Sequence, residues 1–209
     1  MSKKSIFLLL LSINLQAMSQ TKILGEYFFR QTEMVAGFNF SAAGTFRFYL
    51  SYGAVDRSAT GTFLVEGNTI KLKSNKEAGK DFTINEQSKK GSGYTIRFTD
   101  PNKYLLQNIV CIFFVDGEKQ ELLSDSKGEV HSNLPRCDSI YVKHLLYPDI
   151  VTLVKDAAND NNNFSLALNP SLEQVSFKGI DLKIENDHTI SCLPNYFLDM
   201  PAIKFVKND

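Results

Sequence analysis

Apolar residues recur at every second position along most of the chain, which is the period of a half-buried β-strand. In the segment 45–50, the positions that would face a core are Phe46, Phe48 and Leu50. The segment 139–146 is the best candidate for a helix, but its β-branched and aromatic residues favour a strand. The pattern therefore predicts an all-β protein.

A hairpin is predicted in register near residue 67. Pairing Phe63 with Leu72 and Val65 with Ile70 puts four apolar side chains on one face. The two residues left over at 67–68 are Gly and Asn, which tolerate the positive φ that a two-residue hairpin loop requires. The spacing and the turn residues thus predict the same hairpin.

A second hairpin is predicted close to the C-terminus. Pairing Leu182 with Cys192 and Ile184 with Ile190 again places four apolar residues on one face. The loop at 186–188 then has three residues, a length that is common in hairpins. Cys192 is accordingly interpreted as a small core residue.

The polar segment 88–93 is the predicted domain boundary. We expect a small antiparallel β module over 20–92 and a β-sandwich over 93–209. With five or six strands, the first module is too short for a full eight-stranded ligand barrel.

The N-terminus has the pattern of a secretory signal. Two lysines precede the apolar run 6–11, and Ala17 and Ser19 occupy positions −3 and −1 before Gln20. Residues 1–19 are therefore predicted to be a cleavable signal peptide. Its apolar run is too short to cross a bilayer, so we expect a secreted or periplasmic mature chain without a transmembrane anchor.

The charge balance bears on the partners. The chain has 23 basic and 23 acidic residues, so its formal net charge is zero. A neutral chain lacks the basic field that binds phosphate backbones, and we therefore expect no nucleic-acid partner.

Three cysteines, Cys111, Cys137 and Cys192, are an odd number for an exported protein. At most one intramolecular disulfide can form among them, which leaves one thiol buried, reactive or paired elsewhere. The fold is expected to depend on its hydrophobic core rather than on a disulfide framework.

The sequence carries none of the common short motifs for catalysis or metal binding. It contains no His-Glu-x-x-His, Cys-x-x-Cys or Gly-x-Ser-x-Gly motif, so no catalytic residue, metal ligand or cofactor is predicted. The polar run 159–163 is interpreted as a solvated loop between strands. A Ca²⁺ site there is the alternative, although Ala158 stands where the EF-hand spacing requires a ligand.

One cluster, at 49–57, is a candidate for ligand binding. Tyr52, Asp56 and Arg57 place an aromatic ring beside an acid and a base at the end of a predicted strand, a composition that suits peptides or sugars. The alternative is that Asp56 and Arg57 only form a turn, while Tyr52 covers the edge of the sheet.

The second half, over residues 94–150, contains a series of short turn and strand motifs. These are Phe98-Thr99-Asp100-Pro101, Asp116-Gly117, Asp125-Ser126-Lys127-Gly128, Asn133-Leu134-Pro135 and Ile140-Tyr141-Val142. Through them the segment resembles the carboxypeptidase regulatory-like family, which has a transthyretin-type β-sandwich. The resemblance implies an accessory module of an exported protein. The segment departs from the family pattern after Gly128, where Val130 and Ser132 replace an aromatic pair.

The first half, over about 22–88, resembles small lipocalin-like β modules of exported bacterial proteins. The residues that carry this resemblance are Gly25-Glu26-Tyr27, Gly44-Thr45-Phe46, the run 52–57 and Gly61-Thr62-Phe63. The resemblance implies no activity.

Together these features predict an exported bacterial binding or cell-envelope accessory protein of unknown ligand, with an envelope protein or a carbohydrate as the expected partner. A secreted hydrolase with dispersed acidic residues is one alternative. A structural envelope component is another, and an exposed edge strand without protection would distinguish it.

Overall fold

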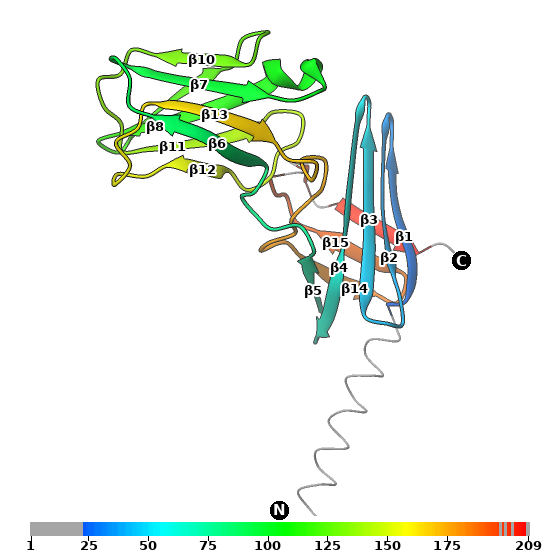
Figure 1. The fold of residues 1–209 in the computed structure, drawn as a ribbon. Coiled ribbons are helices and arrows are strands. Elements are labelled where there is room, and N and C mark those ends of the chain that lie inside the picture. The colour runs from blue at the N-terminus through cyan, green and yellow to red at the C-terminus, as the bar shows by residue number, and fades with distance from the viewer. Residues whose placement is uncertain (1–22, 197, 199, 202, 208–209) are drawn as a thin grey trace, which may run out of the picture. The chain divides into compact units, whose positions relative to one another are not determined.

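The computed structural model describes residues 23–196, 198, 200–201 and 203–207. The predicted signal peptide 1–19 lies outside the described residues. The regular structure is almost entirely β, with one short 3-10 helix, η1 (Lys103–Asn108) (Figure 1). The prediction of an all-β protein is confirmed.

The chain forms two compact units, and the second is inserted into the first. We call them the barrel, which comprises the described residues up to Lys76 and from Val175 onward, and the sandwich, Glu77–Gln174. The predicted boundary at 92/93 instead falls inside the sandwich, between β6 and β7, and the predicted module 93–209 is divided between the units. The period-two pattern identifies each strand but not the strand with which it pairs.

Eight antiparallel strands close the barrel in the order β1-β16-β15-β14-β5-β4-β3-β2. Their bounds are β1 Gly25–Gln31, β2 Met34–Phe40, β3 Thr45–Tyr52, β4 Val55–Glu66, β5 Thr69–Ser74, β14 Asp181–Asn186, β15 Thr189–Cys192 and β16 Ile203–Lys207. The predicted first module, 20–92, is by itself too short for this barrel, as expected, but the prediction did not foresee that strands near the C-terminus would complete it. The N-terminal region supplies β1–β5, and the three strands near the C-terminus complete the closure.

The first predicted hairpin is confirmed in register. β4 and β5 pair Phe63 with Leu72 and Val65 with Ile70, and Gly67 in the loop has φ +62°. Only glycine adopts this left-handed backbone without a steric cost.

The second predicted hairpin is confirmed in its pairing and corrected in its loop. β14 and β15 pair Leu182 with Cys192 and Ile184 with Ile190. Asn186 also pairs with Thr189, so the loop has two residues, and an irregularity beyond Ile184 takes up the extra residue.

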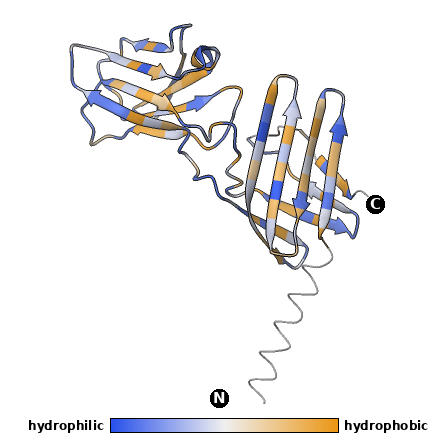
Figure 2. Ribbon diagram, turned by 45° about the vertical axis from the view of Figure 1, so that its right-hand side comes forward, coloured by the Kyte–Doolittle hydropathy of each residue, from blue (hydrophilic) through white to orange (hydrophobic). Residues whose placement is uncertain are grey.

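The interior of the barrel is filled by aromatic rings, and apolar and polar residues alternate along its strands (Figure 2). The buried rings belong to Tyr27, Phe38, Phe40, Phe46, Phe48, Phe63, Phe177 and Phe205. Phe177 precedes β14, and its ring centroid lies 4.9 Å from that of Phe48 and 5.5 Å from that of Phe38. These contacts make the described interior a packed core.

The sandwich has two four-stranded sheets, ordered β10-β7-β13-β6 and β12-β11-β8-β9. Their bounds are β6 Phe82–Ser88, β7 Tyr94–Thr99, β8 Ile109–Val115, β9 Glu118–Leu123, β10 Glu129–Ser132, β11 Ser139–His144, β12 Thr152–Lys155 and β13 Asn163–Leu168. β13 runs parallel to β7 and antiparallel to β6. The strand predicted within 139–146 is confirmed as β11, which ends two residues earlier, at His144.

Candidate functional site

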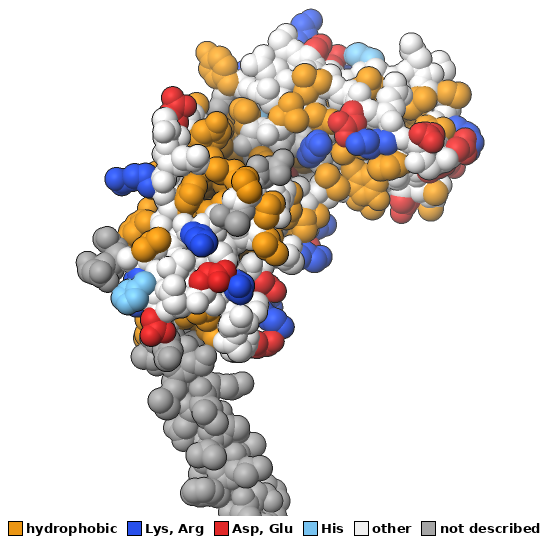
Figure 3. All heavy atoms as spheres, turned by 180° about the vertical axis from the view of Figure 1, so that it is seen from behind, with side chains coloured by type: hydrophobic (Ala, Val, Ile, Leu, Met, Phe, Trp, Pro, Cys, Tyr) orange, Lys and Arg blue, Asp and Glu red, His pale blue; other side chains and the backbone are white. Residues whose placement is uncertain are grey.

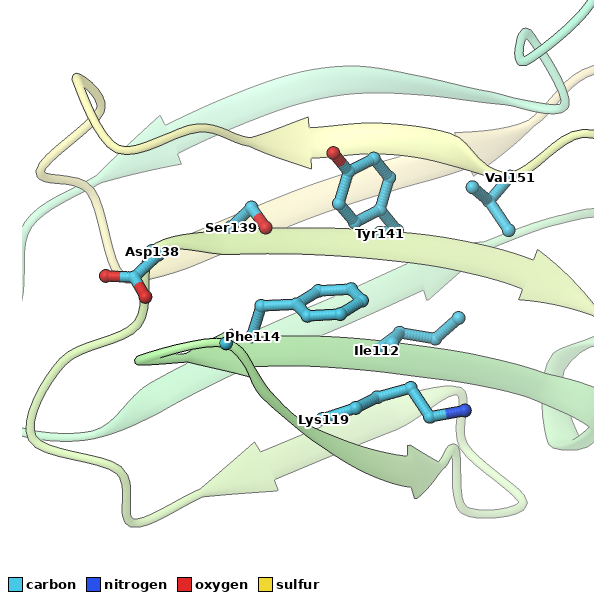
Figure 4. A pocket seen from close by; sticks show the side chains of 8 residues that line it. Ile112, Phe114, Lys119, Asp138, Ser139, Tyr141 and Val151 are labelled. Atoms are coloured by element: carbon cyan, nitrogen blue, oxygen red, sulfur yellow. The ribbon is translucent and has the colours of Figure 1, made fainter.

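The outer face of the sheet β12-β11-β8-β9 carries a shallow groove of about 450 Å³. Its lining residues are Ile112, Phe114, Gly117, Lys119, Asp138, Ser139, Tyr141 and Val151 (Figure 4). We call it the sandwich groove. Its volume lies within the range of ligand-binding pockets.

The sequence of β8 explains why this groove is apolar. Along the strand, Ile109, Cys111 and Phe113 are fully buried, so the alternate side chains point away from the core. The alternate residues include Ile112 and Phe114, so β8 is apolar on both faces. A strand that is apolar on both faces is typical of sheets that are covered on both sides.

Two aromatic rings form the middle of the sandwich groove. Phe114 on β8 and Tyr141 on β11 lie edge to face, with centroids 5.8 Å apart and an interplanar angle of 85°. Figure 4 shows both rings on the same side of the sheet, between Asp138 and Ser139 toward one end and Val151 toward the other.

The apolar surface continues beyond the groove onto both edge strands. Leu153 on β12 pairs with Tyr141, and its side chain is exposed. On the other side, Leu123 on β9 pairs with Val110 and is also exposed. In the space-filling view, apolar side chains gather on the visible face of the sandwich, with charged side chains of both signs among them (Figure 3).

The charged groups at the rim of the groove interact with one another. Lys119 Nζ lies 3.0 Å from Glu121 Oε1, and Lys143 Nζ lies 3.9 Å from the same oxygen. The hydrogen bond from Lys119 is the largest cause that lowers the pKa of Glu121. Asp138 Oδ2 accepts a hydrogen bond of 2.7 Å from the backbone N–H of Asp116. What the groove offers a ligand is therefore mainly apolar contact.

The segment that carries Asp138 is anchored by buried polar groups. The hydroxyl of Tyr94 accepts a hydrogen bond of 3.0 Å from the backbone N–H of Cys137, and burial is the largest cause that raises the pKa of Tyr94 to about 12. Lys155 Nζ donates to the carbonyl oxygens of Cys137 and Asp156, both at 3.0 Å. Neither Tyr94 nor Lys155 stands out in the sequence, because each belongs to a short strand with no motif around it.

The structure does not bring the predicted ligand-binding residues together on one surface. Asp56 pairs with Ser51 on the outer side of the barrel, whereas Arg57 pairs with Leu50 and is 3% exposed. Consecutive residues of a strand point to opposite faces, which separates Asp56 from Arg57. Tyr52 is 53% exposed at the end of β3.

The three cysteines are buried and free in this structure. Cys111 and Cys137 belong to the sandwich, whereas Cys192 belongs to the barrel. Burial raises the pKa of all three thiols, that of Cys192 to about 11.

Residues 159–162 lie in the loop between β12 and β13, as predicted, whereas Asn163 begins β13 and Asn162 is buried rather than solvated. Side chains of the loop bind the backbone: Asn159 Oδ1 accepts from the N–H of Asn161, and Asn162 Oδ1 accepts from the N–H of Lys90. Within the described part of the chain, no three His, Cys, Asp or Glu side chains are grouped so that they could hold a metal ion.

Comparison with known proteins gave no match to a family model, to a curated protein or to a solved structure. The resemblances to the carboxypeptidase regulatory-like and lipocalin-like families stay predictions. No helix in the described ranges is long and apolar enough to span a membrane.

Proposed function

We propose that the protein is an exported bacterial binding or cell-envelope accessory protein, and that its sandwich groove binds an apolar segment of a partner polypeptide. The observation that carries the proposal is the composition of β8, which is apolar on its outer face as well as on its inner face. Apolar patches with polar rims mark interaction surfaces in soluble proteins. The predicted signal peptide supports the assignment to an exported protein.

The chemistry of the groove favours a polypeptide over a carbohydrate at this position. A sugar needs several hydrogen-bonding groups around its ring, whereas the middle of the groove is lined by apolar and aromatic side chains and its charged lining residues are only Lys119 and Asp138. Apolar side chains need only shape and area, which Phe114 and Tyr141 supply. Aromatic residues in such positions contribute much of the binding energy of protein interfaces.

Assembly through the edge strands β9, β10 and β12 is less favoured by the structure. β10 and β12 have four residues each, and β9 carries Glu118, Lys119 and Glu121 along its length. Short strands and charged side chains are the features that protect sheet edges from pairing with other chains. The outer face of the sheet, rather than its edge, is thus the surface that we propose for docking.

The test measures the binding of labelled synthetic peptides to the mature chain by fluorescence anisotropy. One peptide alternates Leu and Phe with Ser, and a second of equal length replaces every Leu and Phe by Ser. The variants are Phe114→Ser and Tyr141→Ser. The matched control is Leu64→Ser, which removes an exposed apolar side chain from the barrel.

We expect the apolar peptide to bind the wild type and the Leu64→Ser variant equally. Each groove variant should weaken binding about tenfold or more, which is the scale of an aromatic hot spot. Circular dichroism confirms that the variants fold. Equal affinity for the two peptides, or equal affinity of all variants, would show that the sandwich groove is not the docking surface.

A further inference from the structure

The outer wall of the barrel has a different chemistry from that of the sandwich groove. The register of β1, β2, β3 and β4 aligns its outward side chains in three rows across the four strands. The first row is Glu26, Asn39, Arg47 and Thr60, the second is Phe28, Gly37, Tyr49 and Ser58, and the third is Arg30, Val35, Ser51 and Asp56. An aromatic row therefore lies between two rows that carry polar and charged groups. We call this surface the barrel wall.

Gly37 allows the ring of Tyr49 to lie down on the sheet. A Cβ atom at Gly37 would be 2.7 Å from Cε1 of Tyr49 and 3.0 Å from both Cζ and Oη, so any side chain there would displace the ring. The ring of Phe28 lies next to it, with centroids 6.5 Å apart. Tyr49 is nevertheless 41% exposed, so the ring presents an open surface to solvent.

Hydrogen-bonding groups line the aromatic row on one side. Asn39 Nδ2 donates to Glu26 Oε1 at 2.8 Å. A carboxylate accepts at two oxygens, and an amide both donates and accepts, so the pair has bonding capacity beyond this one contact. Arg47 and Thr60 are exposed and complete the row.

Charged groups from both outer rows affect the pKa of the Tyr49 hydroxyl. Burial is the largest cause that raises the pKa of Tyr49, the carboxylate of Glu26 raises it further, and Arg30 lowers it. The ring thus lies within the electrostatic reach of an acid from the first row and a base from the third. A hollow of about 500 Å³ lies on this wall, and Glu26, Asn39 and Tyr49 are among its lining residues.

We propose that the barrel wall binds a carbohydrate, with one sugar ring stacked on Tyr49 and its hydroxyl groups bonded to Glu26, Asn39 and Arg47. Neighbouring rows are two residues apart along each strand, or about 6.6 Å, which is the scale of one sugar ring. The mixture of acids, bases and amides suits a neutral polyhydroxylated ligand. A nucleic acid would instead require a positively charged groove, whereas Glu26 and Asp56 lie among the two arginines here.

This proposal is independent of the sandwich groove, because it concerns another unit and another class of ligand. The probes are six-unit oligosaccharides of glucose with β-1,3, β-1,4 or α-1,4 linkage and of N-acetylglucosamine with β-1,4 linkage. Binding to the mature chain is measured by isothermal titration calorimetry, and by amide chemical shifts that locate the contact.

The variants separate stacking from general effects on the barrel. Tyr49→Ala removes the platform, Tyr49→Phe keeps the ring, and Glu26→Gln removes one charge from the first row. The matched control is Tyr52→Ala, which removes an exposed tyrosine at the end of β3 that does not belong to the barrel wall.

We expect at least one oligosaccharide to bind and to shift the amide signals of β1–β4. Tyr49→Ala should weaken its binding about tenfold or more, whereas Tyr49→Phe stays within about threefold of the wild type. Glu26→Gln should weaken binding several-fold, and Tyr52→Ala should leave it unchanged. The proposal is overturned if no probe binds at concentrations up to about 10 mM. It is also overturned if Tyr49→Ala binds as tightly as the wild type.

Discussion

Phe177 fills the barrel from a strained backbone position, and its replacement tests how the core is built. The side chain is fully buried, and its ring contacts those of Phe38, Phe46 and Phe48 at centroid distances of 5.5, 5.7 and 4.9 Å. Its φ is +41°, in the left-handed region that disfavours every residue except glycine. Packing therefore outweighs a local backbone cost at this position.

The packing of the ring and the cost of the left-handed backbone together determine how substitutions of Phe177 should change the stability of the barrel. Truncation of a buried Phe to Ala costs about 3–5 kcal/mol, because apolar contacts are lost and a cavity remains. Alanine retains the left-handed penalty of about 1–2 kcal/mol, which glycine does not have. We therefore expect Phe177→Ala to destabilise the barrel by about 3–5 kcal/mol. Phe177→Gly should be equally stable or about 1 kcal/mol more stable than the alanine variant, although glycine is ordinarily the less stable of the two by about 0.5–1 kcal/mol.

Hydrogen exchange followed by mass spectrometry at increasing guanidinium concentration measures each unit separately. Peptides from Gly25–Ser74 report on the barrel, and peptides from Tyr94–Val115 report on the sandwich as an internal reference. If Phe177→Ala costs the barrel less than about 1 kcal/mol, the ring does not support the core as argued. If glycine is less stable than alanine by its usual margin, the backbone at Phe177 is not strained.

Two further predictions concern protonation and processing. His144 is buried in neutral form, since Nε2 donates to the carbonyl of Leu105 and Nδ1 accepts from the N–H of Leu146, and burial lowers its pKa from 6.5. Below pH 6.5 the unfolded chain binds a proton at His144 that the folded chain does not bind. As the pH decreases below this value, the free energy of unfolding of the sandwich should therefore decrease, by at most about 1.4 kcal/mol per pH unit. Chemical denaturation between pH 8 and 5 measures this slope, and His144→Gln should make it shallower. An identical slope in both proteins would contradict the assignment. Intact mass spectrometry of the protein from its extracytoplasmic fraction, before and after alkylation under denaturing conditions, should show a chain that begins at Gln20 and carries three reduced thiols. A retained signal segment or a mass two hydrogens lower would contradict the cleavage prediction or the free cysteines, respectively.

Local features of the fold could be predicted from the sequence, whereas distant pairings could not. The hairpin at Gly67 depends on residues within ten positions of one another, and both its facing pairs and its turn are confirmed. The pairing of Leu182 on β14 with Ile70 on β5 joins residues on either side of the inserted sandwich. Alternation gives each strand its two faces but no partner, and for this reason the predicted domain boundary was misplaced.

For the candidate sites, too, local features could be predicted from the sequence and distant pairings could not. The alternation that places Phe63 and Val65 in the core also places Arg57 inward. The separation of Arg57 from Asp56 could therefore have been predicted from the sequence. The rows of the barrel wall could not be predicted from the sequence, because they depend on the register of four strands at once. The sandwich groove could not be predicted either: the apolar run of β8 was visible in the sequence, but not which of its faces would line a groove.

The insertion of the sandwich also dictates an order of folding. In a chain that is synthesised or translocated from its N-terminus, β1–β5 emerge first and can form only an open sheet. Its outer strands, β1 and β5, await β16 and β14, and unpaired strand edges are templates for aggregation. The sandwich has all its strands once Leu168 has emerged, so it can fold while the barrel is still incomplete. The last described strand to leave the ribosome or translocon is thus the one that seals the barrel, and the interval before its arrival is when the chain would depend most on a chaperone.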